Sequence, residues 1–130
     1  TCGYCSQSFE VSSGGYMNKQ AREAAIEQVV AEIYEAYPEI LERFGEAGKA
    51  RCYEDNHHHF DHLETAAALG QPEVFTNYAI WLTNLLTARG MNKNHVIDNF
   101  QRIHDVLETT NDSDAKAFQQ LLKQGIQAIQ

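Results

Sequence analysis

The residues best suited to chemistry lie close together between Lys49 and Leu63. This short stretch of a 130-residue chain contains four of the six histidines, together with Cys52 and Asp55. Histidine ligates metals and titrates near neutral pH, so a concentration of histidines is typical of a binding site. We therefore expect the functional site in this stretch.

A helix over this stretch would place a thiol, a carboxylate and imidazoles on one face, because helical residues three and four apart are neighbours. The stripe is formed, in chain order, by Cys52, Asp55, His59 and His62. His58 lies beside this stripe, at steps of three and four from Asp55 and His62. Such a face is equipped to bind one ligand from one side.

Three kinds of cofactor fit these side chains, and the first two are a metal ion and haem. Zinc or iron fits pairs spaced by four residues, such as Asp55 with His59, although a complete metal site needs ligands from a second helix. Haem needs one axial histidine and apolar walls, for which Tyr78 and Trp81 are the aromatic candidates. These two residues also fit an ordinary core cluster with Phe75.

The third cofactor is an open-chain tetrapyrrole, or bilin. It has pyrrole nitrogens that a carboxylate can hold, propionates that an arginine can pair with, and a side chain that a thiolate can attack. Asp55, Arg51 and Cys52 supply these three groups on adjacent turns. The remaining alternative is a face without cofactor, solvated or in contact with a protein, on which Cys52 is a small buried side chain.

The elements that must position these residues are all predicted to be helices. Apolar residues recur at steps of three and four, and prolines and glycines such as Pro38 and Gly70 mark the ends of segments. No segment shows the alternation of a strand. Helices are expected at 18–37, 38–44, 49–69, 72–89, 115–129 and from 92 or 94 to 109, with a break at 45–48. The prediction is one all-α domain of five to six helices at 18–130, preceded by a flexible arm at 1–17.

The composition argues against several classes of protein. A formal net charge of −8, with only 10 lysines and arginines, disfavours a nucleic-acid partner. No apolar run approaches the roughly 18 residues that span a membrane, and no signal-peptide pattern is visible, so we expect a cytoplasmic protein. Cys2 and Cys5 have the spacing of a redox pair or half a zinc site, but the strand or further ligands that these need are not visible. No nucleophile, base and oxyanion site occur together, so we expect no enzymatic activity.

Residues Lys49 to Leu107 resemble the phycobiliproteins, the light-harvesting proteins of cyanobacterial antennae, and still more the phycobiliprotein-like sensor modules of non-photosynthetic bacteria. The shared pattern is Cys-x-x-Asp, ring residues, an Ala-rich run and glycine, followed by an aromatic helix that ends in Arg-Gly. The matching residues are Cys52, Asp55, His59, Phe60, Leu63, Ala66, Ala67, Ala68, Gly70, Phe75, Tyr78, Trp81, Leu82, Arg89 and Gly90. Asp61 stands where antenna proteins have an arginine, and the N-terminal helical pair that assembles them is shortened. The resemblance therefore implies a sensor and not an antenna protein.

The resemblance implies a globin-like fold that holds a bilin of biliverdin or phycocyanobilin type. Cys52 would be the thioether attachment point, and Asp55 would lie under the inner pyrrole nitrogens. His58, His59 and His62 would take the places of ring-contacting tyrosines. The implied function is a photoreceptor or ligand sensor that signals to a protein partner; the alternatives are a cofactor-free globin-like interaction domain and a haem-binding sensor globin. A homodimer is expected, with the apolar stripe of the first long helix as its contact.

Overall fold

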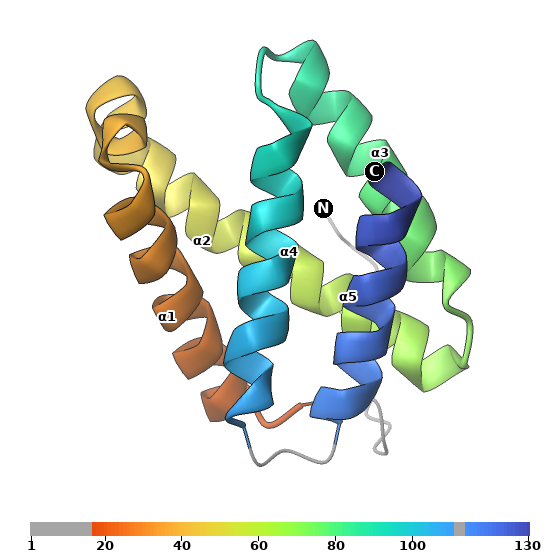
Figure 1. Cartoon of the computed structure of the whole chain (residues 1–130). Coiled ribbons are helices and arrows are strands. Elements are labelled where there is room, and N and C mark those ends of the chain that lie inside the picture. The colour runs from red at the N-terminus through yellow and green to blue at the C-terminus, as the bar shows by residue number, and fades with distance from the viewer. Residues whose placement is uncertain (1–16, 111–113) are drawn as a thin grey trace.

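The computed structural model describes residues 17–110 and 114–130, and every regular element in these ranges is a helix (Figure 1). The helices are α1 (Lys19–Ala36), α2 (Pro38–Leu69), α3 (Glu73–Ala88), α4 (Lys93–Glu108) and α5 (Ala115–Ile129). The all-α prediction is confirmed, and the helix ends lie within one residue of those expected except at the break inside α2. Cys2 and Cys5 lie outside the described residues. No helix in the described ranges has the length and apolar character needed to cross a membrane.

The break inside α2 is a single residue, shorter than the predicted interruption at 45–48. Gly45 has φ 71° and ψ −168°, a left-handed φ that glycine adopts without the steric cost of a side chain, whereas Gly48 is helical. The segment 38–44 and the long part of α2 are therefore two helical pieces joined by a kink. Figure 1 shows this corner at the upper left, beside the end of α1.

Asparagine side chains fix the starts of two helices. Asn18 accepts hydrogen bonds from the backbone amides of Gln20 and Ala21, at 2.8 and 3.1 Å. Asn92 accepts one from the amide of Asn94 at 2.7 Å. Because the first amides of a helix have no partner within it, these side chains determine where α1 and α4 begin.

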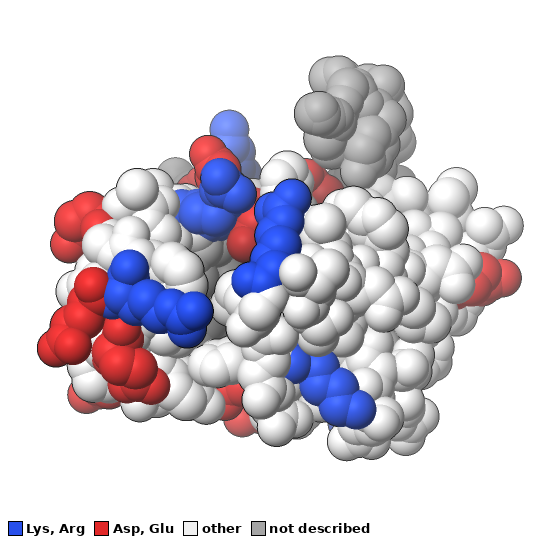
Figure 2. Space-filling view, turned by 90° about the horizontal axis from the view of Figure 1, so that it is seen from above, with Lys and Arg blue, Asp and Glu red and all other residues white. Residues whose placement is uncertain are grey.

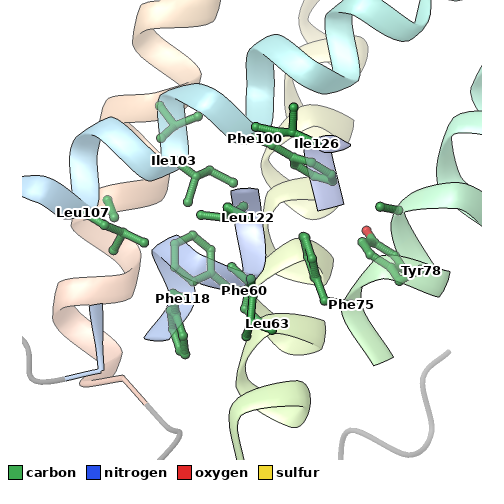
Figure 3. Close-up of a cluster of buried hydrophobic side chains, with 14 of the residues drawn as sticks. Phe60, Leu63, Phe75, Tyr78, Phe100, Ile103, Leu107, Phe118, Leu122 and Ile126 are labelled. Carbon is green, nitrogen blue, oxygen red and sulfur yellow. The ribbon is translucent and has the colours of Figure 1, made fainter. Parts of the chain in front are cut away.

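Four phenylalanines form the centre of the core, and each comes from a different helix (Figure 3). Phe60, Phe75, Phe100 and Phe118 come from α2, α3, α4 and α5, and all four are 0% exposed. The helices α4 and α5 pack side by side over this cluster (Figure 1). The core therefore holds the histidine-bearing helix α2 against three other elements.

The apolar stripe of α1 is buried in the same core. Ile26, Val29 and Val30 are 0% exposed, and Ile33 is also buried. These residues are buried by contacts within the same chain. They are therefore not available as the homodimer contact expected from the sequence.

Arg22 fixes the orientation of α2 against α1. Its guanidinium donates hydrogen bonds to the Asp61 carboxylate at 2.7 Å, to the Glu64 carboxylate at 2.9 Å and to the backbone carbonyl of His57 at 2.8 Å. Glu64 also accepts a hydrogen bond from the amide of Met17 at 3.3 Å. Charge-assisted bonds from one planar guanidinium constrain direction as well as distance, so they hold the helix that carries the histidines in one rotation about its axis.

Candidate functional site

A cavity of about 450 Å³ lies between α1, both parts of α2, the end of α3 and the start of α4. The stretch identified in the sequence supplies four of its lining residues, which are Arg51, Cys52, Asp55 and His59. Three of them, Cys52, Asp55 and His59, belong to the stripe expected on one helix face, whereas its fourth member, His62, does not line the cavity. The volume falls within the range of about 300–1,000 Å³ that is usual for small-molecule sites.

Apolar side chains form most of the wall opposite these residues. Ile40 and Phe44 come from the segment before the kink, and Leu82 and Leu86 come from α3. Phe44 is still 45% exposed, so this side of the cavity is partly open to solvent. The cavity therefore suits a ligand with a large apolar body that does not have to be fully enclosed.

Two exposed arginines line the cavity from different helices. Arg51 lies on α2, and Arg89 is the C-terminal cap of α3. Figure 2 shows this end of the molecule, with Lys and Arg side chains on either side of a hollow. The sequence analysis gave Arg51 a role in binding propionates but gave Arg89 none beyond the family pattern, because nothing in the sequence shows that the end of α3 lies against α2.

Two carboxylates line the cavity, Asp55 and Asp98. Asp98 accepts a hydrogen bond from Arg102 at 2.7 Å, whereas Asp55 makes no hydrogen bond or ion pair with a residue in the described ranges. Burial raises its pKa above the ordinary value of 3.8, while the positive charges of His58, Arg51 and Arg89 act in the opposite direction. A carboxylate in such surroundings is stabilised when hydrogen-bond donors reach it. The site therefore presents an acceptor to an incoming ligand.

Cys52 is a free, partly buried cysteine one turn before Asp55. Burial and, to a smaller extent, the neighbouring Asp55 carboxylate together raise the pKa of its thiol to about 11. The side-chain amide of Asn56 donates to the Cys52 carbonyl at 2.9 Å and lies 3.8 Å from its sulfur. The thiol is therefore protonated at neutral pH, which makes it a weak nucleophile.

Asn56 and Asn99 form a polar pair behind the cavity that the sequence analysis missed. Their side-chain amides exchange two hydrogen bonds, at 3.2 and 2.8 Å, and Asn56 is 0% exposed. The pair ties α2 to α4, and Asn99 also lines the cavity. Isolated asparagines carry no pattern in the sequence, so only the fold reveals that they face each other.

His59 is buried at the inner end of the stripe and shares a 2.6 Å hydrogen bond with the Tyr78 hydroxyl through Nδ1. Burial, with smaller contributions from the nearby His58 and His62, lowers its pKa to about 3. The imidazole is therefore neutral over the physiological pH range. Its ring also meets the Phe100 ring edge-on, with centroids 5.1 Å apart, so its orientation is fixed from two sides.

The other four predicted site residues do not line this cavity. His62 stacks on the Tyr78 ring, with centroids 3.8 Å apart and planes within 11°. Trp81 lies 6.2 Å from Tyr78 and is 58% exposed. His58 is half exposed, with Nδ1 3.9 Å from the Asp61 carboxylate. The side chains of His62, Tyr78 and Trp81 form a second cluster, which is joined to the cavity by the hydrogen bond between Tyr78 and His59.

Three further ring residues line the cavity without having been predicted. Tyr34 comes from α1, Tyr37 is the C-terminal cap of α1, and His95 comes from the start of α4. Burial raises the pKa of Tyr34, and the nearby Cys52 contributes in the same direction. The sequence does not single out His95, because no spacing relates it to the stripe on α2.

Comparison of the chain with protein-family models, with curated proteins and with solved structures found no match. In the ranges that the structure describes, no group of three or more His, Cys, Asp or Glu side chains is arranged to hold a metal ion. The geometry of the cavity is therefore the basis on which a function is proposed.

Proposed function

We propose that the cavity binds a bilin and that the domain reports the bound ligand to a protein partner without catalysing a reaction. The observation that carries this proposal is the Asp55 carboxylate, which faces an apolar-walled cavity without a hydrogen-bond partner among the described residues. The inner pyrrole N–H groups of a bilin are donors of the kind that such a carboxylate needs. The resemblance to bilin-binding sensor modules points to the same residue.

The arginines supply the second match between ligand and site. A bilin carries two propionates, and Arg51 and Arg89 lie on two sides of the same cavity. Guanidinium groups pair with carboxylates through two parallel hydrogen bonds, so two arginines can fix both the position and the direction of the ligand. The apolar body of the ligand then lies against the side chains from α3 and the kinked segment.

Cys52 lines the cavity, but its thiol is not activated for covalent attachment. A thioether would form by a bond from its sulfur to an unsaturated carbon of the bilin side chain, with the thiol proton passing to the adjacent carbon. This addition needs no oxidant or reductant. Because the thiol pKa is about 11, the thiolate that must attack is scarce at neutral pH. Binding therefore begins as a non-covalent association, with Asp55 and the arginines as its main contacts.

Signalling requires that the two states of the ligand, or its presence and absence, interact differently with the protein. The cavity is lined by α1, α2, α3 and α4, so an occupant contacts four helices at once. A change in the shape of the ligand, or its release from the cavity, would therefore alter how these four helices pack against one another.

The test is co-expression of the chain with a haem oxygenase, which supplies biliverdin, followed by absorption spectroscopy of the purified protein. We expect a red absorption band in the wild type and a strongly reduced one in Asp55→Asn. The matched control is Glu54→Gln, which changes an exposed carboxylate outside the cavity on the same helix turn. A colourless wild type, or equal pigment in the two variants, contradicts the proposal.

Zinc-induced fluorescence of the denatured chain reports covalent attachment separately. Fluorescence that remains on the wild-type chain and disappears in Cys52→Ser places the link at Cys52. Absence of fluorescence together with a red band establishes a bilin that is bound without a thioether.

Haem is the second candidate, because two histidines, His59 and His95, line the cavity. His59 is neutral at physiological pH, which is the form that ligates iron. In this case the protein purified from cells supplied with a haem precursor shows a Soret band that either His59→Gln or His95→Gln abolishes. A protein that remains colourless with both pigments supports the third possibility, an interaction domain without cofactor.

A further inference from the structure

The outward face of α3 carries no charge beyond its first turn. Its exposed residues after Glu73 are Asn77, Ile80, Trp81, Asn84, Thr87 and Ala88. Ile80 is 41% exposed and Trp81 58% exposed, which makes them two of the four exposed large apolar side chains among the described residues. Figure 2 shows a broad, nearly uncharged area on the right of the molecule, where Figure 1 places α3.

This face differs from the rest of an acidic molecule. The chain has 18 acidic residues against 10 lysines and arginines. The outward face of α1, for comparison, carries exposed carboxylates at Glu23, Glu27 and Glu35. Two copies that met through α1 would bring these like charges together, whereas two copies that met through α3 would not. A second copy of the chain can therefore pack against the face of α3 without the repulsion between like charges that it would meet at α1.

We propose that the chain forms a homodimer in which α3 packs antiparallel against α3 of the partner subunit, with Ile80 and Trp81 at the two-fold axis. A closed dimer uses the same patch on both subunits, so the patch must be complementary to itself. The helix runs from residue 73 to residue 88, and its midpoint lies between Ile80 and Trp81. An axis through this midpoint brings Ile80 against Trp81 of the partner subunit.

The same axis pairs the polar residues on either side of the centre. Asn77 comes to lie opposite Asn84 of the partner subunit, and two such amide pairs can exchange hydrogen bonds. Glu73, the one charged residue of the face, lies opposite Ala88 of the partner subunit. The two Glu73 carboxylates are then separated by about the length of the helix, roughly 24 Å at 1.5 Å per residue. A parallel arrangement would instead place them together.

One helix face is a small contact, so the dimer is expected to be concentration-dependent. Each subunit carries a formal charge of −8, and the two subunits repel each other through the rest of their surfaces. Salt screens this repulsion and leaves the uncharged contact unaffected, so higher salt strengthens the dimer. The proposal does not depend on a bilin, because neither Ile80 nor Trp81 lines the cavity.

The first test is sedimentation equilibrium of the full chain over a wide range of protein and salt concentrations. We expect a monomer–dimer equilibrium that shifts toward dimer with salt, and a shift of its midpoint to about tenfold higher concentration or more in Trp81→Glu. The matched control is Leu69→Glu, which adds the same charge at another exposed large apolar residue, 60% exposed and outside both α3 and the cavity. A monomer at all concentrations, or equal effects of the two variants, overturns the proposal.

The second test introduces charged residues at Asn77 and Asn84 to determine whether the two α3 helices pack in the proposed antiparallel register. In the proposed dimer, Asn77→Asp combined with Asn84→Asp and Asn77→Lys combined with Asn84→Lys both place like charges opposite each other. Asn77→Asp combined with Asn84→Lys places opposite charges together. We expect both like-charge variants to weaken the dimer at low salt and the mixed variant to retain it. If all three variants behave alike, the antiparallel register is wrong. Circular dichroism verifies that each variant is folded.

Discussion

At the scale of residues, the proposed chemistry of the cavity depends on Asp55, because the other lining carboxylate, Asp98, is already paired with Arg102. Asp55 faces apolar walls, and burial raises its pKa while the positive charges of Arg51 and Arg89 oppose that shift. The surroundings thus keep a carboxylate available to donors without giving it a partner of its own among the described residues. Burial also raises the pKa of the neighbouring Cys52 thiol and lowers that of the His59 imidazole.

Cys52 is predicted to be unreactive at neutral pH despite its place in the cavity. In a chain carrying Cys2→Ser and Cys5→Ser, alkylation of Cys52 by iodoacetamide is expected to be slow at pH 7. The rate should rise about tenfold per pH unit as the thiolate fraction grows toward the pKa of about 11. Asp55→Asn should speed the reaction at pH 7, because the Asp55 charge raises the thiol pKa. A thiol that reacts at the same rate at pH 7 and pH 9 refutes this assignment.

His59 is predicted to make the stability of the fold depend on pH. Its pKa is about 3 in the folded chain, against an ordinary value of 6.5. Between these values the unfolded chain binds a proton that the folded chain does not, so the free energy of unfolding falls as pH falls below 6.5. One such group contributes a slope of up to about 1.4 kcal/mol per pH unit.

Urea denaturation between pH 4 and pH 7 measures this slope. His59→Gln is expected to show a smaller loss of stability on acidification than the wild type. His58→Gln, at a half-exposed position, serves as the control and should behave like the wild type. If His59→Gln and the wild type lose stability in parallel, His59 is not the buried neutral group described here.

At the scale of elements, the helix boundaries could be predicted because their signals are local. Pro38 at a helix start and Gly70 at a left-handed helix end each act on their own neighbours in sequence. The break in α2 was predicted too long, because two glycines mark it and sequence alone does not show that Gly45 takes the positive φ while Gly48 remains helical.

The candidate site could be predicted only in part, for a related reason. The stripe on α2 depends on helical spacing alone, and three of its four residues, Cys52, Asp55 and His59, line the same cavity, whereas His62 does not. Arg89, His95 and Asn99 enter the cavity from α3 and α4 through tertiary packing, and no periodicity connects them to α2. Tyr78 and His62 fit the expected aromatic character, but their stacking on each other is decided by the crossing of α2 and α3.

The close packing of α5 on α3 yields a prediction for Gly125. A β-carbon at this position would lie 2.6 Å from Cε2 of Phe75 and 3.6 Å from the side chain of Ala79. Because Phe75 is fully buried and cannot move aside freely, Gly125→Ala is expected to cost about 1–3 kcal/mol of stability. Gln124→Ala, at an exposed neighbouring position, should change the free energy of unfolding by much less. Urea denaturation measures the free energy of unfolding of both variants. Equal values for Gly125→Ala and Gln124→Ala would contradict the close packing of Gly125 against Phe75.

At the scale of the whole molecule, α3 separates the cavity from the proposed dimer face. Leu82 and Leu86 line the cavity on one side of the helix, while Trp81 lies on the other side. Tyr78 lies between them and joins the buried His59 to the aromatic cluster that includes Trp81. One helix therefore contacts both the ligand site and the surface on which a second copy would bind.

The central claim is that Asp55 holds a bilin in the cavity, and an equilibrium titration of purified chain with biliverdin tests it most directly. Absorption changes give the Kd for the wild type, Asp55→Asn and Glu54→Gln. Loss of a charge-assisted hydrogen bond is worth about 1.5–3 kcal/mol, so Asp55→Asn should weaken binding by roughly ten- to over a hundred-fold. Glu54→Gln should bind like the wild type. No saturable binding, or the same Kd for Asp55→Asn and the wild type, would contradict the account.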